Sequence, residues 1–387
     1  MMRPFLVLLL GLFCVCPSIS YSSDESVLPS IRVLIAKDLK DFTVSVGNKF
    51  KIIDPRTQEV LYEGKRLKDS KVNATDYGIN VGEYFFVQRH IRIISENSFT
   101  ITSKGIAKRY RGGVDVISGP LKKIYLINDV EIETYIRGVL YHEVTDRWPI
   151  EAIKAQAVAA RTYAYFQRSQ NKNNEFDLTN DIYSQVYGGR SAERYRTNIA
   201  VKKTEGEVLY FEGKILPAYF HANCGGQTEN VKELWEDQKN LTPLWGVVCP
   251  YCKDGPAYSW KRNFRLQDFQ EKLVKAGYSV GVIQEISIVD KNESGRNEWL
   301  LIKSRDGRQL KMEGKKFREI IGPNVIRSNN YDIVMKGYYC DLIGKGWGHG
   351  VGMCQWGAYA MSVQRFTYQQ ILSFYYPGSE IVTTTQK

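Results

Sequence analysis

The sequence lacks the short motifs of several common enzyme classes. It has no GxSxG, no Walker phosphate-binding loop, no HExxH and no dinucleotide-binding fingerprint. These absences exclude the motif-bearing serine hydrolases, P-loop nucleotide hydrolases, metalloproteases and Rossmann dehydrogenases. The sequence also has no internal repeat, no low-complexity tract and no nucleic-acid-binding motif. No nucleic-acid partner is therefore expected.

What the chain has is length and positive charge. Its 387 residues exceed the usual size of a single hydrophobic core, so two or more domains are expected. Its formal net charge of +11 favours an anionic surrounding, such as nucleic acid, acidic lipid or an acidic wall polymer. Charge alone does not choose among these partners.

The N-terminus resembles an export signal. Arg3 precedes an apolar run at residues 5–15, and Ser18 and Ser20 follow with the spacing that signal peptidase recognises. We predict a signal peptide over residues 1–20 and export to the periplasm or cell wall. The alternative is an uncleaved leader, through which alone the protein would associate with a membrane, since no later segment is apolar enough to cross one.

Hydrophobic patterning predicts an α+β fold with a β-rich N-terminal region, residues 21–125. Short β-branched and aromatic runs between turn residues fill this region from residue 30 onward. Helical spacing follows at 132–140, and an Ala-rich stretch at 150–170 predicts a long buried helix. We assign residues 126–387 to a mixed α/β core. In it we expect a hairpin turning at Gly213, a helix near 266–276, and a helical segment over 356–375.

Glu143 is a candidate acid catalyst. It follows a predicted helix, whose C-terminal carbonyls give partial negative charge, and apolar residues such as Leu140 and Trp148 are close in sequence. Both influences disfavour the carboxylate, and a carboxyl with a raised pKa is what a general acid in glycosidic cleavage needs. From local sequence alone, a solvated loop glutamate remains the alternative.

Arg161 lies within the Ala-rich helix, where most neighbours are predicted to be buried. A buried arginine needs an acidic partner or an anionic substrate group. The sequence leaves both possibilities open.

Cysteine spacing suggests a metal site. His221 and Cys224 form an H-x-x-C pair, and Cys249 and Cys252 form a C-x-x-C pair. Together they match a closed tetrahedral zinc site, which would be structural because catalytic zinc keeps an open position. A redox disulfide within C-x-x-C and ordinary structural disulfides, including one between Cys340 and Cys354, are the alternatives.

The block WGHGVGMCQWGA has the composition of a sugar-binding loop. Its glycines allow close backbone approach, and its aromatic and amide groups suit the faces and hydroxyls of a sugar ring. A glycine-rich packing corner with core tryptophans is the alternative.

Four blocks occur in one order along the chain, namely YIRGVLYHEVTDRWPIEAIKAQAVAARTYAYF, SQVYGG, YFHANCGGQTEN, and GWGHGVGMCQWGAYAM followed by YYPG. They resemble the signature blocks of the stage II sporulation protein D and LytB amidase-enhancer family, over roughly residues 125–385. The resemblance implies an exported lytic transglycosylase that acts on peptidoglycan glycan strands, often ones stripped of stem peptides by an amidase.

The resemblance also implies roles for residues. Glu143 falls on the family's catalytic acid. The substrate groove would be lined by Arg161, Gln185, Tyr187, Tyr219, His221, His349 and Gln355. Many relatives have serine where this chain has Cys224, which favours zinc in this subgroup and makes His221 either a metal ligand or a substrate contact. Zinc, if bound, would not be required for the chemistry.

The mechanism expected from the family needs one enzymic carboxyl. Glu143 would protonate the glycosidic oxygen between MurNAc and GlcNAc and then deprotonate the MurNAc 6-hydroxyl, which closes a 1,6-anhydro ring. Two other functions remain open. The protein could be a non-catalytic wall-binding module that stimulates an N-acetylmuramoyl-L-alanine amidase, or a hydrolase with a catalytic zinc at His221 and the cysteines.

Overall fold

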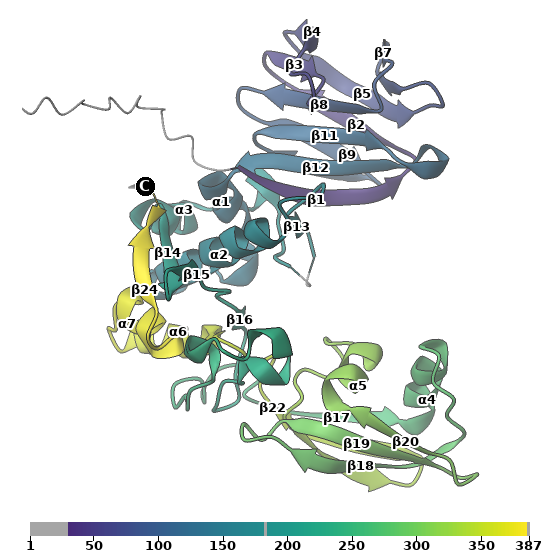
Figure 1. Cartoon of the computed structure of the whole chain (residues 1–387), viewed down its shortest axis with the longest axis vertical. Coiled ribbons are helices and arrows are strands. Elements are labelled where there is room, and N and C mark those ends of the chain that lie inside the picture. Colours follow the sequence, from purple (N-terminus) through teal and green to yellow (C-terminus); the bar gives the residue numbers. More distant parts are fainter. Residues whose placement is uncertain (1–29, 182–183, 385–387) are drawn as a thin grey trace, which may run out of the picture.

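The structure is a computed structural model that describes residues 30–181 and 184–384. The predicted signal peptide, residues 1–20, lies outside these described residues. The fold is α+β, as predicted, and Figure 1 shows three successive parts: a β-sandwich, a helical core and a smaller α/β unit at the far end.

The N-terminal part is a sandwich of two sheets. The first has the spatial order β13 (Leu178–Thr179), β1 (Ser30–Leu39), β12 (Ile124–Glu131), β11 (Gly113–Ser118), β8 (His90–Ser95), β3 (Phe50–Ile53) and β4 (Val60–Gly64). The second has the order β10 (Ile106–Tyr110), β9 (Phe99–Ser103), β2 (Asp41–Val46), β5 (Leu67–Ala74), β6 (Ile79–Val81) and β7 (Tyr84–Phe86). Alternate residues, such as Phe42, Val44 and Val46 of β2, are buried, because one face of each sheet packs on the shared core.

The helical core follows directly and is continuous with the hydrophobic core of the sandwich. Its helices are α1 (Ile132–Glu143), α2 (Ile150–Gln170), α3 (Tyr195–Lys203), α6 (Gln355–Val363) and α7 (Tyr368–Tyr375). Helix α2 confirms the predicted Ala-rich helix. Its small side chains let other elements pack closely around it, so that residues such as Ala157 and Ala160 are fully buried.

Short strands complete the helical core. One small sheet holds β15 (Lys214–Ile215), β14 (Glu207–Phe211) and β24 (Glu380–Thr383), and the β14–β15 hairpin turns at Gly213 as predicted. A second pair joins β16 (Phe220–His221) in parallel to β23 (Met353–Cys354), so that segments about 130 residues apart in sequence lie side by side.

The helical character predicted over 356–375 is confirmed, but it is divided between two helices, α6 and α7. The chain leaves the helical conformation between α6 and α7, where Arg365 has φ +67°. Thr367 then starts α7 with a capping box, in which its hydroxyl accepts from the Gln370 backbone while the Gln370 side chain accepts from the Thr367 backbone. The capping box therefore begins α7 as a helix separate from α6.

Between β16 and β23 the chain makes a unit with its own hydrophobic core, which we call the inserted unit (residues 259–345). Its elements are β17 (Ser259–Arg265), α4 (Leu266–Lys275), β18 (Ile283–Lys291), β19 (Asn297–Ser304), β20 (Gln309–Glu313), α5 (Gly314–Ile321), β21 (Tyr331–Lys336) and β22 (Tyr339–Lys345). They form two three-stranded sheets, β17-β22-β21 and β18-β19-β20, with α4 and α5 beside them (Figure 1). Among the described residues, no helix combines the length and apolar character needed to cross a membrane.

Candidate active site

A cleft of about 450 Å³ is formed jointly by the helical core and the inserted unit. The helical core supplies most of its walls: Glu143, Tyr163, Asp181, Ser184, Val186, Tyr219, Phe220, His221, Ala222, Trp235, Trp347, Gly348, His349 and Gln355. The inserted unit supplies Lys315, Arg318, Glu319, Pro323 and Asn324, from α5 and the segment after it. The predicted groove residues Tyr219, His221, His349 and Gln355 therefore meet Glu143 in one cleft.

Glu143 is the last residue of α1, and its side chain is half-buried in the cleft wall. Burial raises the pKa of its carboxyl to about 7. Two hydrogen bonds oppose this effect: the Gln355 amide donates to Oε2 at 3.5 Å, and the Val186 backbone also bonds the carboxylate. The group is thus a carboxyl that both holds and releases a proton near neutral pH, which suits acid–base chemistry.

Backbone hydrogen bonds determine which ring nitrogens of the two cleft histidines, His221 and His349, are donors and which are acceptors. His349 Nε2 donates to the Phe220 carbonyl at 2.9 Å, and its Nδ1 accepts from the Val351 backbone at 3.1 Å, so both nitrogens are satisfied. His221 Nδ1 donates to the Val351 carbonyl at 3.1 Å, which leaves a buried Nε2 lone pair with no partner. His221 therefore keeps one buried hydrogen-bond acceptor without a partner, behind the wall of the cleft.

Glycines bring the loop that carries His349 against strand β16. Gly348 and Gly352 have φ values of +115° and +72°, which only glycine adopts without strain. A Cβ on Gly352 would lie 2.0 Å from the Tyr219 carbonyl oxygen, and one on Gly348 would lie 2.7 Å from His221 Cβ. The Gly-rich block is thus both a close-packed corner and a wall of the cleft.

Aromatic rings line the cleft as well. Tyr219 and Trp235 stack with centroids 4.3 Å apart and an interplanar angle of 13°. Trp347 also lines the cleft, and its side chain is 40% exposed. Flat apolar faces beside hydrogen-bonding groups are suited to sugar rings.

Three residues predicted to bind substrate lie elsewhere. Arg161 is fully buried and forms a two-point ion pair with Glu133, with both N···O distances 2.7 Å, so it is a core residue and not a groove residue. Gln185 is buried and bonds the Tyr135 hydroxyl and the Ala160 carbonyl.

Tyr187 is also buried, and its hydroxyl donates to Asn128 Oδ1 at 2.7 Å. Burial alternates along this segment: Ser184 and Val186 are partly exposed and line the cleft, while Gln185 and Tyr187 are buried in the core. The SQVYGG block therefore reaches the cleft through the residues between those that we predicted.

Sequence reasoning missed several cleft residues. Tyr163 lies one turn of α2 beyond Ala160, but its position among core alanines gave no sign of exposure to a cleft. Trp235 and Asp181 lie in irregular segments without a recognisable pattern. The contribution of α5 required knowledge of how the inserted unit packs.

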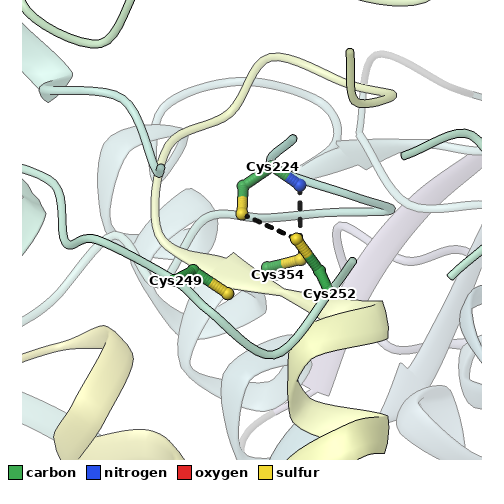
Figure 2. Close-up of side chains that lie close together, drawn as sticks. All are labelled: Cys224, Cys249, Cys252 and Cys354. Atoms are coloured by element: carbon green, nitrogen blue, oxygen red, sulfur yellow. Dashed lines mark hydrogen bonds between the residues drawn. The ribbon is translucent and has the colours of Figure 1, made fainter. Parts of the chain in front are cut away.

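The cysteine cluster differs from the predicted ligand set. Cys224, Cys249, Cys252 and Cys354 are buried, and their sulfur atoms all lie within 4.8 Å of one another (Figure 2). Cys354 takes the fourth place because β23 pairs with β16, whereas His221 is held away by its bond to Val351 and faces the cleft. The predicted membership of His221 is therefore corrected to Cys354.

The geometry of the cluster fits a metal better than disulfides. All five described cysteines are free thiols, and the sulfur atoms of Cys224 and Cys252 lie 3.3 Å apart. A disulfide bond would be about 2.05 Å long, whereas four thiolates around zinc are separated by about 3.8 Å. Cys340 lies in the core of the inserted unit, so the alternative Cys340–Cys354 disulfide is excluded.

Comparison with known proteins identifies the family. A family model described as "Stage II sporulation protein" matches residues 121–211, which include α1, α2 and Glu143. The stage II sporulation protein D of Bacillus amyloliquefaciens is 30% identical over 270 residues, 66% of this chain and 75% of that protein. The chain belongs to the stage II sporulation protein D family.

Two further relatives are informative for this family member. An uncharacterized protein of Brachyspira hyodysenteriae is 32% identical over 355 residues, 91% of this chain and 92% of that protein. The amidase enhancer of Bacillus subtilis is 28% identical over 290 residues, 64% of this chain and 40% of that protein. A model for a domain of unknown function matches residues 235–352, which contain the inserted unit.

Proposed function

We propose that the protein is an exported peptidoglycan lytic transglycosylase, active in the periplasm or cell wall, and that Glu143 is its acid and base. The observation that carries this proposal is a carboxyl with a pKa of about 7 in the wall of an aromatic-lined cleft. Membership of a family that includes stage II sporulation protein D supports it. The leader pattern of residues 1–20 and the charge of +11 support export toward an anionic wall.

The proposed reaction uses one carboxyl twice. Protonated Glu143 gives its proton to the glycosidic oxygen, the bond from that oxygen to MurNAc C1 breaks, and GlcNAc leaves as an alcohol. The Glu143 carboxylate then takes the proton of the MurNAc 6-hydroxyl, whose oxygen bonds to C1. The proton is back on Glu143, water is not consumed, and no second carboxylate is needed, unlike in two-carboxylate glycosidases.

The cleft offers suitable contacts for the sugars. The exposed ring of Trp347 and the Tyr219–Trp235 stack provide faces for the C–H surfaces of sugar rings. Gln355 bonds Glu143 and keeps the carboxyl in a defined position.

We also propose that the four-cysteine cluster binds a structural zinc ion, with Cys354 as the fourth ligand. A closed set of four thiolates leaves no open position for substrate, so zinc would stabilise the fold and take no part in the chemistry. Cys354 is the N-cap of α6 and directly precedes Gln355. The cluster would therefore fix the start of α6 behind the cleft.

Mass spectrometry of peptide-free glycan strands tests the activity. We expect 1,6-anhydro ends from the wild type and none from Glu143→Gln, while Glu205→Gln, a matched change at a surface ion pair with Lys202, should cleave normally. Reducing ends would instead indicate hydrolysis by water and a second catalytic group.

A second candidate function is a non-catalytic wall-binding enhancer of an N-acetylmuramoyl-L-alanine amidase, which the similarity to an amidase enhancer favours. It predicts intact strands with both the wild type and Glu143→Gln. It also predicts that the folded wild type and the folded Glu143→Gln variant increase the reaction rate of an added amidase by the same factor.

A further inference from the structure

The inserted unit brings positive charge to the proposed active site. Helix α5 places Lys315, Arg318 and Glu319 in the wall of the cleft that also contains Glu143. Glu319 is paired with Lys316 at 3.1 Å, and Lys315 lies 3.4 Å from Glu313. Arg318 differs from these neighbours, because it forms no ion pair with any carboxylate in the described part of the chain.

Arg318 is held rigidly by the backbone of its own unit. Its Nε donates to the Ile326 carbonyl at 2.8 Å, and its Nη2 donates to the carbonyls of Pro323 and Arg327 at 3.2 and 3.0 Å. These bonds fix the plane of the guanidinium and leave Nη1 unused. The pKa of Arg318 falls to about 10 because of burial, so the group remains positively charged at neutral pH.

The Arg318 charge lies close to the Gly-rich loop. Burial, together with the charge of Arg318, lowers the pKa of His349 to about 4. In the same region the Arg327 guanidinium lies 5.1 Å from the centroid of the Trp347 ring. An exposed tryptophan face is therefore combined with two guanidinium groups, neither of which has a carboxylate partner among residues 30–181 and 184–384.

A neutral sugar does not require such an arrangement. Aromatic faces and amide groups bind sugars without net charge, and an unpaired, partly desolvated guanidinium is unfavourable unless an anion compensates it. A fixed guanidinium edge is suited to a carboxylate, which it binds through directed, charge-assisted hydrogen bonds. The ligand expected here is a sugar that carries a carboxylate.

We propose that Arg318 binds the lactyl carboxylate of a MurNAc residue that has lost its stem peptide, while Trp347 contacts the sugar ring. This inference rests on the proposed function, because it assumes that glycan strands occupy the cleft. While a stem peptide is attached, the lactyl group is a neutral amide with a bulky substituent. Removal of the peptide creates the one anionic group on the sugar itself. Arg318 would thus be the residue by which the cleft distinguishes a free lactyl carboxylate from a lactyl amide that carries a peptide.

The test measures binding of intact strands to full-length Glu143→Gln. Two ligands are compared: peptide-free glycan strands, and the same strands with lactyl carboxylates converted to neutral methylamides. We expect the native strands to bind at least about tenfold more tightly, the range for a charge-assisted hydrogen bond. The chemical change leaves the protein untouched, so this comparison does not depend on how a variant folds.

Protein variants then assign the effect to one residue. Arg318→Met in the Glu143→Gln background should remove the preference for native strands, and Arg318→Lys should retain part of it. Arg305→Met is the matched control, because Arg305 stacks on Tyr338 in the same unit at 4.9 Å and does not line the cleft. The control should keep the full preference.

Two outcomes would overturn the inference. Equal binding of native and methylamidated strands would show that the lactyl charge is not recognised, while glycan binding and the proposed reaction would stand. Absence of binding by either strand to folded protein would remove the proposed function, and this inference with it.

Discussion

The side-chain amide of Gln355 lies 3.5 Å from Glu143 Oε2, so the first residue of α6 contacts the last residue of α1. The same Gln355 nitrogen is 3.4 Å from Gln156 Oε1 of α2. Three helices therefore meet at the carboxyl that we propose as the catalyst. This contact favours the ionised form of Glu143, whereas burial favours the protonated form with the larger effect.

The first prediction concerns the pH dependence of cleavage. Because the raised pKa of about 7 keeps Glu143 protonated below neutrality, kcat/KM should decline as pH rises above about 7. Gln355→Leu removes a hydrogen bond that lowers this pKa, so its decline should occur at higher pH. Rates on peptide-free strands between pH 5 and 9, in roughly half-unit steps, measure both midpoints. If the midpoint of the wild-type decline in kcat/KM lay far from pH 7 and did not move in Gln355→Leu, the decline would belong to a group other than Glu143.

The second prediction concerns stability. In the unfolded chain Glu143 ionises near its ordinary pKa of about 4.3, whereas in the folded protein it ionises near 7. Between these values only the folded state holds the proton, so this residue lowers the free energy of unfolding as pH rises. Glu143→Gln should therefore gain about 3 kcal/mol relative to wild type between pH 4 and 8. Urea unfolding at several pH values measures it, and a pH-independent difference would contradict the assigned pKa.

The sequence predicted the parts of the fold that depend on local periodicity. Helix α2 has the predicted bounds, and the hairpin at Gly213 is present. The break between α6 and α7 was missed, because apolar spacing continues across it while Thr367 provides a cap that the pattern did not reveal.

Contacts between distant segments could not be predicted in this way. The fourth member of the cysteine cluster depends on the pairing of β16 with β23, and short two-residue strands leave no periodic signal. Likewise, the sequence around Arg161 was compatible with either an ion pair or a substrate anion. The ion pair with Glu133 of the preceding helix, a contact between two helices, decides between them. The cleft wall formed by α5 depends on the packing of two hydrophobic cores, which no local pattern encodes.

The third prediction concerns metal content. We expect about one zinc per chain in purified wild-type protein, and loss of that zinc with marked loss of thermal stability in Cys354→Ser. Cys340→Ser is the matched control, since Cys340 is also a buried free thiol but lies in the core of the inserted unit. His221→Gln should retain its zinc. Elemental analysis measures the zinc content of each variant, and thermal unfolding measures its stability. Loss of zinc from His221→Gln but not from Cys354→Ser would instead support the ligand set predicted from sequence.

The fourth prediction concerns Arg161, which binds the Glu133 carboxylate and the backbone carbonyl of Glu207 in the helical core. Glu133 in turn accepts from the Gly206 backbone at 2.9 Å. Arg161→Met would leave a buried carboxylate without its cation, so the free energy of unfolding should fall by about 3 to 5 kcal/mol. Replacing both partners by apolar residues should restore much of this loss, because the unpaired charge disappears with them.

A surface pair provides the comparison for this fourth prediction. Lys202 and Glu205 lie at the end of α3 with partly exposed side chains, and Lys202→Met should cost less than about 1 kcal/mol. Chemical denaturation gives all these values, and strand binding can be measured under conditions where Arg161→Met remains folded. Binding should then match the wild type, because Arg161 does not line the cleft. Normal stability together with weakened strand binding would instead make Arg161 a substrate contact, and the core ion pair would lose its assigned role.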